Sequence, residues 1–142
     1  MNAPAMPWYW GLVHCEGGSF IQYFNPFIGP QMFRNKSKQR SKLDWGDISL
    51  SKSIVFYHRE SDTEYEFDSS DISIDHTISD GLPTFLVTGK DKEKEIKIEL
   101  KAYSRAYWRF EEPKRFFRNP VFHYNEYPSE LTDFYFKNSS IK

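Results

Sequence analysis

The stretch Lys94-Glu-Ile-Lys-Ile-Glu-Leu-Lys101 decides the fold. Ile96, Ile98 and Leu100 occupy alternate positions, and charged residues fill most of the positions between and around them. A period of two places apolar side chains on one face of an extended strand, whereas a helix would distribute them around its axis. The segment therefore predicts a β-strand with one face in the core and the other in water.

The alternation continues beyond Lys101 as far as Phe110, with small or apolar residues on one face and Tyr or Arg on the other. An unbroken strand over 94–110 would be longer than strands usually are. We therefore expect a bend or bulge near residues 102–104.

Further strand signals lie on both sides at short intervals, and no window has a useful helical period. Gly17-Gly18 and Asp80-Gly81 provide residues suited to tight turns, and a further turn is expected over residues 89–93. The other expected strands cover residues 8–15, 20–24, 54–57, 65–67, 72–74, 84–88, 121–127 and 131–137.

The composition agrees with a β fold. Aromatic residues make up 18% of the 142-residue chain, whereas the strong helix formers Ala and Leu number only 4 and 7. An antiparallel sheet of roughly nine to ten strands must close or split to cover its edges and apolar face. We expect a lipocalin-like β-barrel as a single domain over residues 8–137, with a lead-in at 1–7 and a tail at 138–142. A β-sandwich is the alternative.

Charge and length limit the function classes. The formal net charge of -1 argues against nucleic-acid binding, and no stretch approaches the roughly 20 apolar residues of a membrane-spanning helix. The single cysteine, Cys15, excludes an internal disulfide. The amino end lacks the pattern of a secretory signal, so a cytoplasmic location is expected. The basic segment 34–42 fits a solvated loop or a contact with phosphate or anionic lipid.

Several motifs occur in a suggestive order: Trp8-Tyr9-Trp10, Gly17-Gly18, Leu82-Pro83 before the alternating strand, and Tyr107-Trp108. This order resembles the C-terminal lipocalin-like half of the carotenoid hydratase (hydroxyneurosporene synthase) and tocopherol cyclase-like superfamily. The resemblance implies a barrel that binds an isoprenoid-like or lipid-like molecule.

The chain also departs from that family. The Trp-x-Asp-His-x-Trp-like segment of the family's first half has no counterpart, since Asp75-His76 lacks the flanking Trp residues. Residues 125–130 stand where the family has a Gly-rich final turn. The resemblance therefore implies the barrel more strongly than it implies an enzymatic activity.

Three residues are candidates for proton transfer: His14, Glu126 and Asp133. His14 shares a strand face with Trp10 and Leu12, so it would be a polar group in an apolar pocket if that face lined the barrel. A carboxylate of Glu126 or Asp133 that pointed into the barrel would have a raised pKa and could protonate an alkene or epoxide. The alternatives are a hydrogen-bonded core histidine and exposed or salt-bridged carboxylates.

The remaining candidates are residues that would line a ligand pocket. Tyr and Trp combine apolar surface with a polar tip, although the same rings also serve as ordinary core packing. No metal site and no cofactor are expected, because the histidines have no ligand spacing and phosphate-binding loops are missing from the sequence. The expected ligand-binding residues are Trp8, Trp10, His14, Phe24, Tyr65, Phe85, Tyr107, Trp108, His123 and Tyr124.

The sequence thus favours binding of a small apolar, lipid- or isoprenoid-like molecule inside the barrel. One alternative is a cofactor-independent hydratase, cyclase or isomerase acting on an isoprenoid-type substrate. The other is a non-catalytic protein-interaction module, which a filled interior with exposed aromatic side chains would favour. Whether any reaction is catalysed and the oligomeric state both stay open.

Overall fold

Antiparallel β-strands make up most of the chain that the structure describes. The computed structural model describes residues 8–28, 48–49, 51–111 and 121–139. Within these ranges the other regular elements are two short 3-10 turns, Glu16–Gly18 and Ser69–Asp71. Every strand pair is antiparallel. The predicted all-β, antiparallel class is confirmed.

The first large sheet has the strand order β1-β2-β4-β5, with the short β3 paired to β2. The second has the order β11-β8-β7-β6. The first sheet consists of β1 (Trp8–His14), β2 (Phe20–Ile28), β3 (Ile48–Ser49), β4 (Ser53–His58) and β5 (Thr63–Phe67). The second consists of β6 (Ile72–Ser79), β7 (Leu82–Lys90), β8 (Lys94–Ala102) and β11 (Ser129–Asn138).

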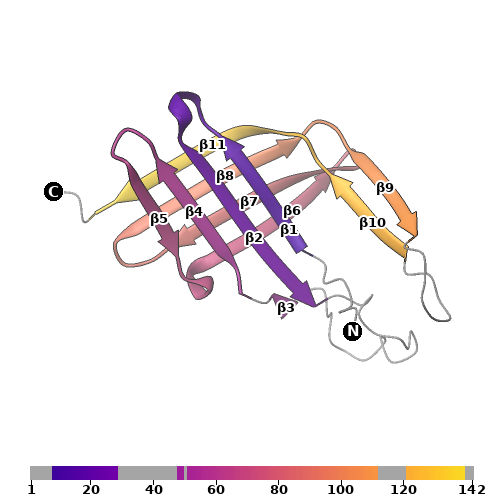
Figure 1. Cartoon of the computed structure of the whole chain (residues 1–142), viewed down its shortest axis with the longest axis horizontal. Helices are drawn as coiled ribbons and strands as arrows, with labels where there is room; N and C mark the ends of the chain where they lie inside the picture. Colours follow the sequence, from indigo (N-terminus) through magenta and orange to yellow (C-terminus); the bar gives the residue numbers. More distant parts are fainter. Residues whose placement is uncertain (1–7, 29–47, 50, 112–120, 140–142) are drawn as a thin grey trace.

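The strands of the first sheet cross over those of the second, and a separate two-stranded ribbon lies beyond one end of them (Figure 1). This ribbon consists of β9 (Ala106–Glu111) and β10 (Val121–Glu126). Among the described strands, no backbone pairing joins the two large sheets. The arrangement therefore fits a sandwich or an open barrel, and the described strands do not form the closed barrel that we expected.

The core lies between the two large sheets. The strand that decides the fold behaves as predicted, because Ile96, Ile98 and Leu100 on β8 are buried while Lys97 and Lys101 on the alternate positions are exposed. Edge-on ring contacts connect the sheets, and the Phe56 ring on β4 lies 4.9 Å from that of Phe136 on β11. The other buried apolar side chains are Val13, Ile21, Tyr23, Ile54, Phe56, Phe67, Ile72, Phe85, Val87 and Ala102.

The predicted turns and bend largely agree with the structure. Gly17 and Gly18 have φ angles of 83° and 88°, and Asp80 and Gly81 have φ angles of 53° and 77°. At Asp80-Gly81, the two-residue loop between the paired Ser79 and Leu82, positive φ at both central residues matches the right-handed twist of the strands. Gly17 and Gly18 lie instead in the longer loop between the paired His14 and Phe20. The chain leaves β8 at Ala102 and re-enters a strand at Ala106, which confirms the bend near 102–104.

The turn predicted over residues 89–93 is shorter in the structure. Gly89 and Lys90 belong to β7, so the turn covers residues 91–93 rather than 89–93. Gly89 is buried, and a Cβ there would lie 2.9 Å from the Phe67 ring and 3.3 Å from Ile54 Cδ1. This glycine therefore allows the two sheets to approach each other. Its role is packing rather than chain reversal.

We predict that Gly89→Ala lowers the free energy of unfolding by about 1 to 3 kcal/mol, because the added methyl group overpacks the core against Phe67. Urea unfolding followed by circular dichroism measures the change. Lys90→Ala, at an exposed position on the same strand, is the control and should cost no more than about 1 kcal/mol. Equal losses in the two variants would contradict the packing role of Gly89.

Candidate functional site

Five of the residues that the sequence analysis selected lie together on the ribbon of β9 and β10, which we call the aromatic ribbon. They are Tyr107, Trp108, His123, Tyr124 and Glu126. The register pairs Tyr124 with Trp108 and Glu126 with Ala106 on one face, and Asn125 with Tyr107 on the other. The sequence thus predicted a real cluster, but the structure places it outside the two large sheets (Figure 1).

Trp108 and Tyr124 form the centre of one ribbon face. Their ring centroids are 5.6 Å apart and the ring planes are tilted by 43°. Trp108 is 48% exposed and Tyr124 is 38% exposed, so neighbouring side chains do not cover the pair. Two adjacent rings with this much free surface form a binding platform, since aromatic groups lose much water-exposed area when a partner covers them.

Polar contacts fix the edge of this platform. The Tyr124 hydroxyl donates a hydrogen bond of 3.2 Å to Glu126 Oε1. This bond raises the pKa of Tyr124, because the ionised phenol could no longer donate it. Glu126 itself is exposed. It therefore lacks the apolar surroundings on which its expected role as a proton donor depended.

The opposite face of the ribbon carries charged groups that already have partners. The Arg105 guanidinium donates two hydrogen bonds, of 2.9 and 2.6 Å, to Asn125 Oδ1 and lies 5.2 Å from the centre of the Tyr107 ring. Arg109 and Glu111 form an ion pair of 3.0 Å. This face therefore presents little unpaired charge to a partner.

The expected pocket face of β1 points toward solvent, which corrects the sequence interpretation. Trp10 and Leu12 are 52% and 43% exposed, and His14 is also exposed. The inner face of this strand carries the alternate residues, of which Val13 is buried. Phe24 lies opposite Trp10 on the same outer face. The side chains of Trp8 and His123 lie outside the described part of the structure, as does the basic segment 34–42.

A β-bulge explains why Asp133 is also on the outside. The pairing of β11 with β8 shifts between Leu131 and Asp133, so that Leu131 and Phe134 both reach the inner face. An extra residue in one strand reverses the alternation beyond it. The exposed Asp133 carboxylate lies 3.9 Å from Lys97 Nζ, so it is a surface carboxylate and not an acid inside an apolar pocket.

Two predicted ligand-binding residues do point inward, and both are packed against other rings. Phe85 is 9% exposed, and its ring lies 6.1 Å from those of Tyr9 and Tyr127. The half-buried Tyr65 ring lies 4.8 Å from that of Phe136. Both rings therefore contribute to the contact between the two large sheets.

Sequence reasoning missed Asn25, a polar residue inside the molecule. Asn25 lies on β2 opposite Tyr9 and is 4% exposed, and its side-chain Oδ1 has no hydrogen-bond partner within the described part of the chain. The sequence does carry a signal for the burial of Asn25, because Ile21, Tyr23 and Asn25 occupy alternate positions and the first two are core residues. The strand expected over residues 20–24 ends just before Asn25, since Asn25-Pro26 is a common turn sequence.

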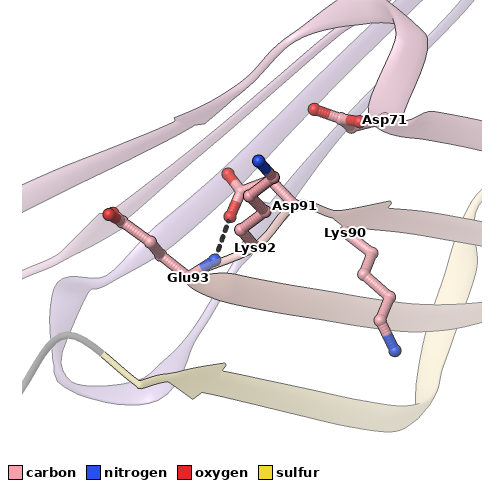
Figure 2. Close-up of a pocket in the computed structure, with 5 residues that line it drawn as sticks. All are labelled: Asp71, Lys90, Asp91, Lys92 and Glu93. Atoms are coloured by element: carbon pink, nitrogen blue, oxygen red, sulfur yellow. Dashed lines mark hydrogen bonds between the residues drawn. The ribbon is translucent and has the colours of Figure 1, made fainter.

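A charged surface hollow lies at the turn between β7 and β8 (Figure 2). The Asp91 carboxylate accepts hydrogen bonds of 2.8 and 2.9 Å from the backbone N–H groups of Glu93 and Lys94, and it also contacts the Lys94 ammonium group. These bonds lower the pKa of Asp91 to about 2. The Lys94 ammonium group in turn lies 4.9 Å from the centre of the Phe67 ring. The contacts of Asp91 beside this hollow therefore stabilise the turn between β7 and β8 and give no indication of a ligand site.

We predict that Asp91→Asn destabilises the protein at neutral pH and that this difference from the wild type disappears in acid. Because folding lowers the pKa of Asp91, its stabilisation is complete above the unfolded-state pKa near 3.8 and is lost as the pH falls toward about 2. Thermal unfolding between pH 7 and pH 2 measures this convergence. Glu93→Gln, which removes a carboxylate outside these bonds, is the control. A difference at pH 2 as large as that at pH 7 would contradict the assignment.

No family model matches the chain, and no curated protein or solved structure is significantly similar to it. The resemblance to the carotenoid hydratase and tocopherol cyclase-like superfamily therefore stays a prediction. The part of the chain that the structure describes holds no helix with the length and apolar character needed to cross a bilayer. Among the same residues, no three His, Cys, Asp or Glu side chains gather as potential metal ligands.

Proposed function

We propose that this protein is a non-catalytic interaction module and that the Trp108–Tyr124 face of the aromatic ribbon binds a partner protein. The observation that carries the proposal is the pair of exposed rings, 5.6 Å apart, on a ribbon that pairs with neither large sheet among the described strands. Exposed aromatic groups of this size are uncommon without a binding role when they adjoin one another.

The composition of the ribbon fits a protein partner. Tyr, Trp and Arg are the residues that most often dominate binding energy at protein interfaces, and Trp108, Tyr124 and Tyr107 are all exposed here. The paired groups at the ribbon edge, such as Tyr124 with Glu126, provide a polar rim around the rings. A partner that covers the ring face would gain apolar contact without separating buried charges.

The interior supports this proposal over a central ligand cavity. The ring of Tyr23 occupies the space where a side chain at Gly11 would lie, and five aliphatic side chains between the sheets are almost completely buried. A lipocalin-like carrier of a small apolar molecule remains a second candidate, and the unpaired Asn25 Oδ1 favours it. The hydratase or cyclase alternative has weaker support, since His14, Glu126 and Asp133 are all exposed.

We predict that Trp108→Ala weakens binding of the natural partner at least about tenfold, as expected when a central aromatic residue of an interface is removed. The partner is first identified by photo-crosslinking from a benzophenone amino acid at Glu126, which is exposed on the same face as Trp108 and Tyr124, and its dissociation constant is then measured with purified proteins. Tyr124→Ala should act in the same direction.

Tyr135→Ala is the matched control, because Tyr135 is exposed to a similar extent but lies on β11 of the second sheet. It should change the dissociation constant less than twofold. The proposal is wrong if Trp108→Ala and Tyr124→Ala both bind the partner as tightly as the wild type does.

A further inference from the structure

Asn25 is an anomaly in the core. Its side chain is almost fully buried, yet Oδ1 accepts no hydrogen bond from the residues that the structure describes. A buried amide oxygen without a partner costs free energy, and nearly all buried polar atoms in native proteins are paired. A buried acceptor without a donor therefore suggests that another molecule provides the donor.

A chain of aromatic side chains begins at the residue across the sheet from Asn25. The register places Tyr9 directly across from Asn25 on the inner face of the first sheet. The Tyr9 ring lies 5.7 Å from that of His76 and 6.1 Å from that of Phe85. Phe85 is in turn 6.1 Å from Tyr127. We call Tyr9, His76, Phe85 and Tyr127 the seam cluster, because they connect β1, β6, β7 and the segment between β10 and β11.

The seam cluster lies where the two large sheets meet through side chains alone. β1 is an edge strand of the first sheet and β6 is an edge strand of the second, and the described residues form no backbone pairing between them. The Tyr9–His76 ring contact bridges these edges, and His76 is exposed while Tyr9 is half-buried. Side-chain rotation of Tyr9 can therefore open a path to Asn25 without breaking a strand pair.

We propose that this seam binds a small molecule that has an apolar body and one O–H or N–H donor. The donor bonds to Asn25 Oδ1, and the apolar body packs against the rings of Tyr9 and Phe85. A pocket with apolar walls and one convergent polar group is the usual design of a small-molecule site. The seam is distinct from the aromatic ribbon, so this proposal does not depend on the partner-binding function.

The ligand class follows from the single acceptor. An alcohol, phenol or amide can donate to Oδ1, whereas an ether or hydrocarbon of the same shape leaves it unpaired. Sites built around a buried hydrogen-bonding group reject ligands that lack the matching group much more strongly than they reject small changes in apolar size. We therefore expect selection for the donor rather than for a particular carbon skeleton.

The test compares matched ligand pairs with the full chain. The probes are 2-naphthol with 2-methoxynaphthalene, and 1-octanol with methyl octyl ether, each titrated by protein-observed NMR. For at least one pair, the wild type should bind the donor compound about tenfold more tightly or better, with shifts at Tyr9 and Phe85. In Asn25→Leu, which keeps the branching at Cγ and has no acceptor, this preference should fall below twofold.

A stability measurement distinguishes a ligand-binding role of the Asn25 amide from a structural role. Removing an unpaired buried polar group should raise the urea midpoint of ligand-free Asn25→Leu above that of the wild type. Gln22→Leu, at an exposed amide on the outer face of the same strand, should change neither the midpoint nor the preference. The proposal is overturned if Asn25→Leu lowers the midpoint, which would mean that Oδ1 is already satisfied by water or backbone. It is also overturned if neither probe pair shows a donor preference in the wild type.

Discussion

The structure depends on the contact between the inner faces of two β-sheets whose described strands share no backbone pairing. Each sheet alone would expose a row of aliphatic and aromatic side chains, so neither is stable without the other. Ile96 and Ile98 on β8 face Ile21 and Ile54 of the first sheet within the shared core. The contact is close because Gly89 on β7 leaves room for the ring of Phe67 on β5. Burial of apolar surface, rather than strand pairing, therefore joins the two halves.

The same constraint explains which parts of the fold the sequence could predict. Alternation with period two reflects burial of one strand face, so the strands around Ile96 and Val87 and the break after Ala102 were evident from the residues. Glycines with positive φ marked the turn at Gly17-Gly18. These signals are local, and each depends only on the chemistry of a short segment.

The errors arose where the answer depends on distant parts of the chain. Alternation along β1 shows that Trp10 and His14 share a face, but only the position of the second sheet determines that this face is the outer one. The bulge near Asp133 cannot be recognised from composition, and it reverses the orientation of every residue beyond it. Asn25-Pro26 looks like a turn when its own segment is considered alone. The burial of Asn25 depends on residues of other strands, such as Tyr9, which that segment does not reveal. Whether a sheet closes or splits is likewise set by packing between strands that are far apart in sequence.

The exposure of Trp10 and Trp108 has a practical consequence for spectroscopy. Indole emission responds to the polarity around the ring, and both of these rings already contact water in the folded protein. Their fluorescence therefore reports poorly on melting of the aliphatic core, for which backbone dichroism is the better probe. The same property makes Trp108 a sensitive intrinsic reporter of events at the ribbon, since covering its ring would move the indole from water into an apolar environment and shift its emission to the blue.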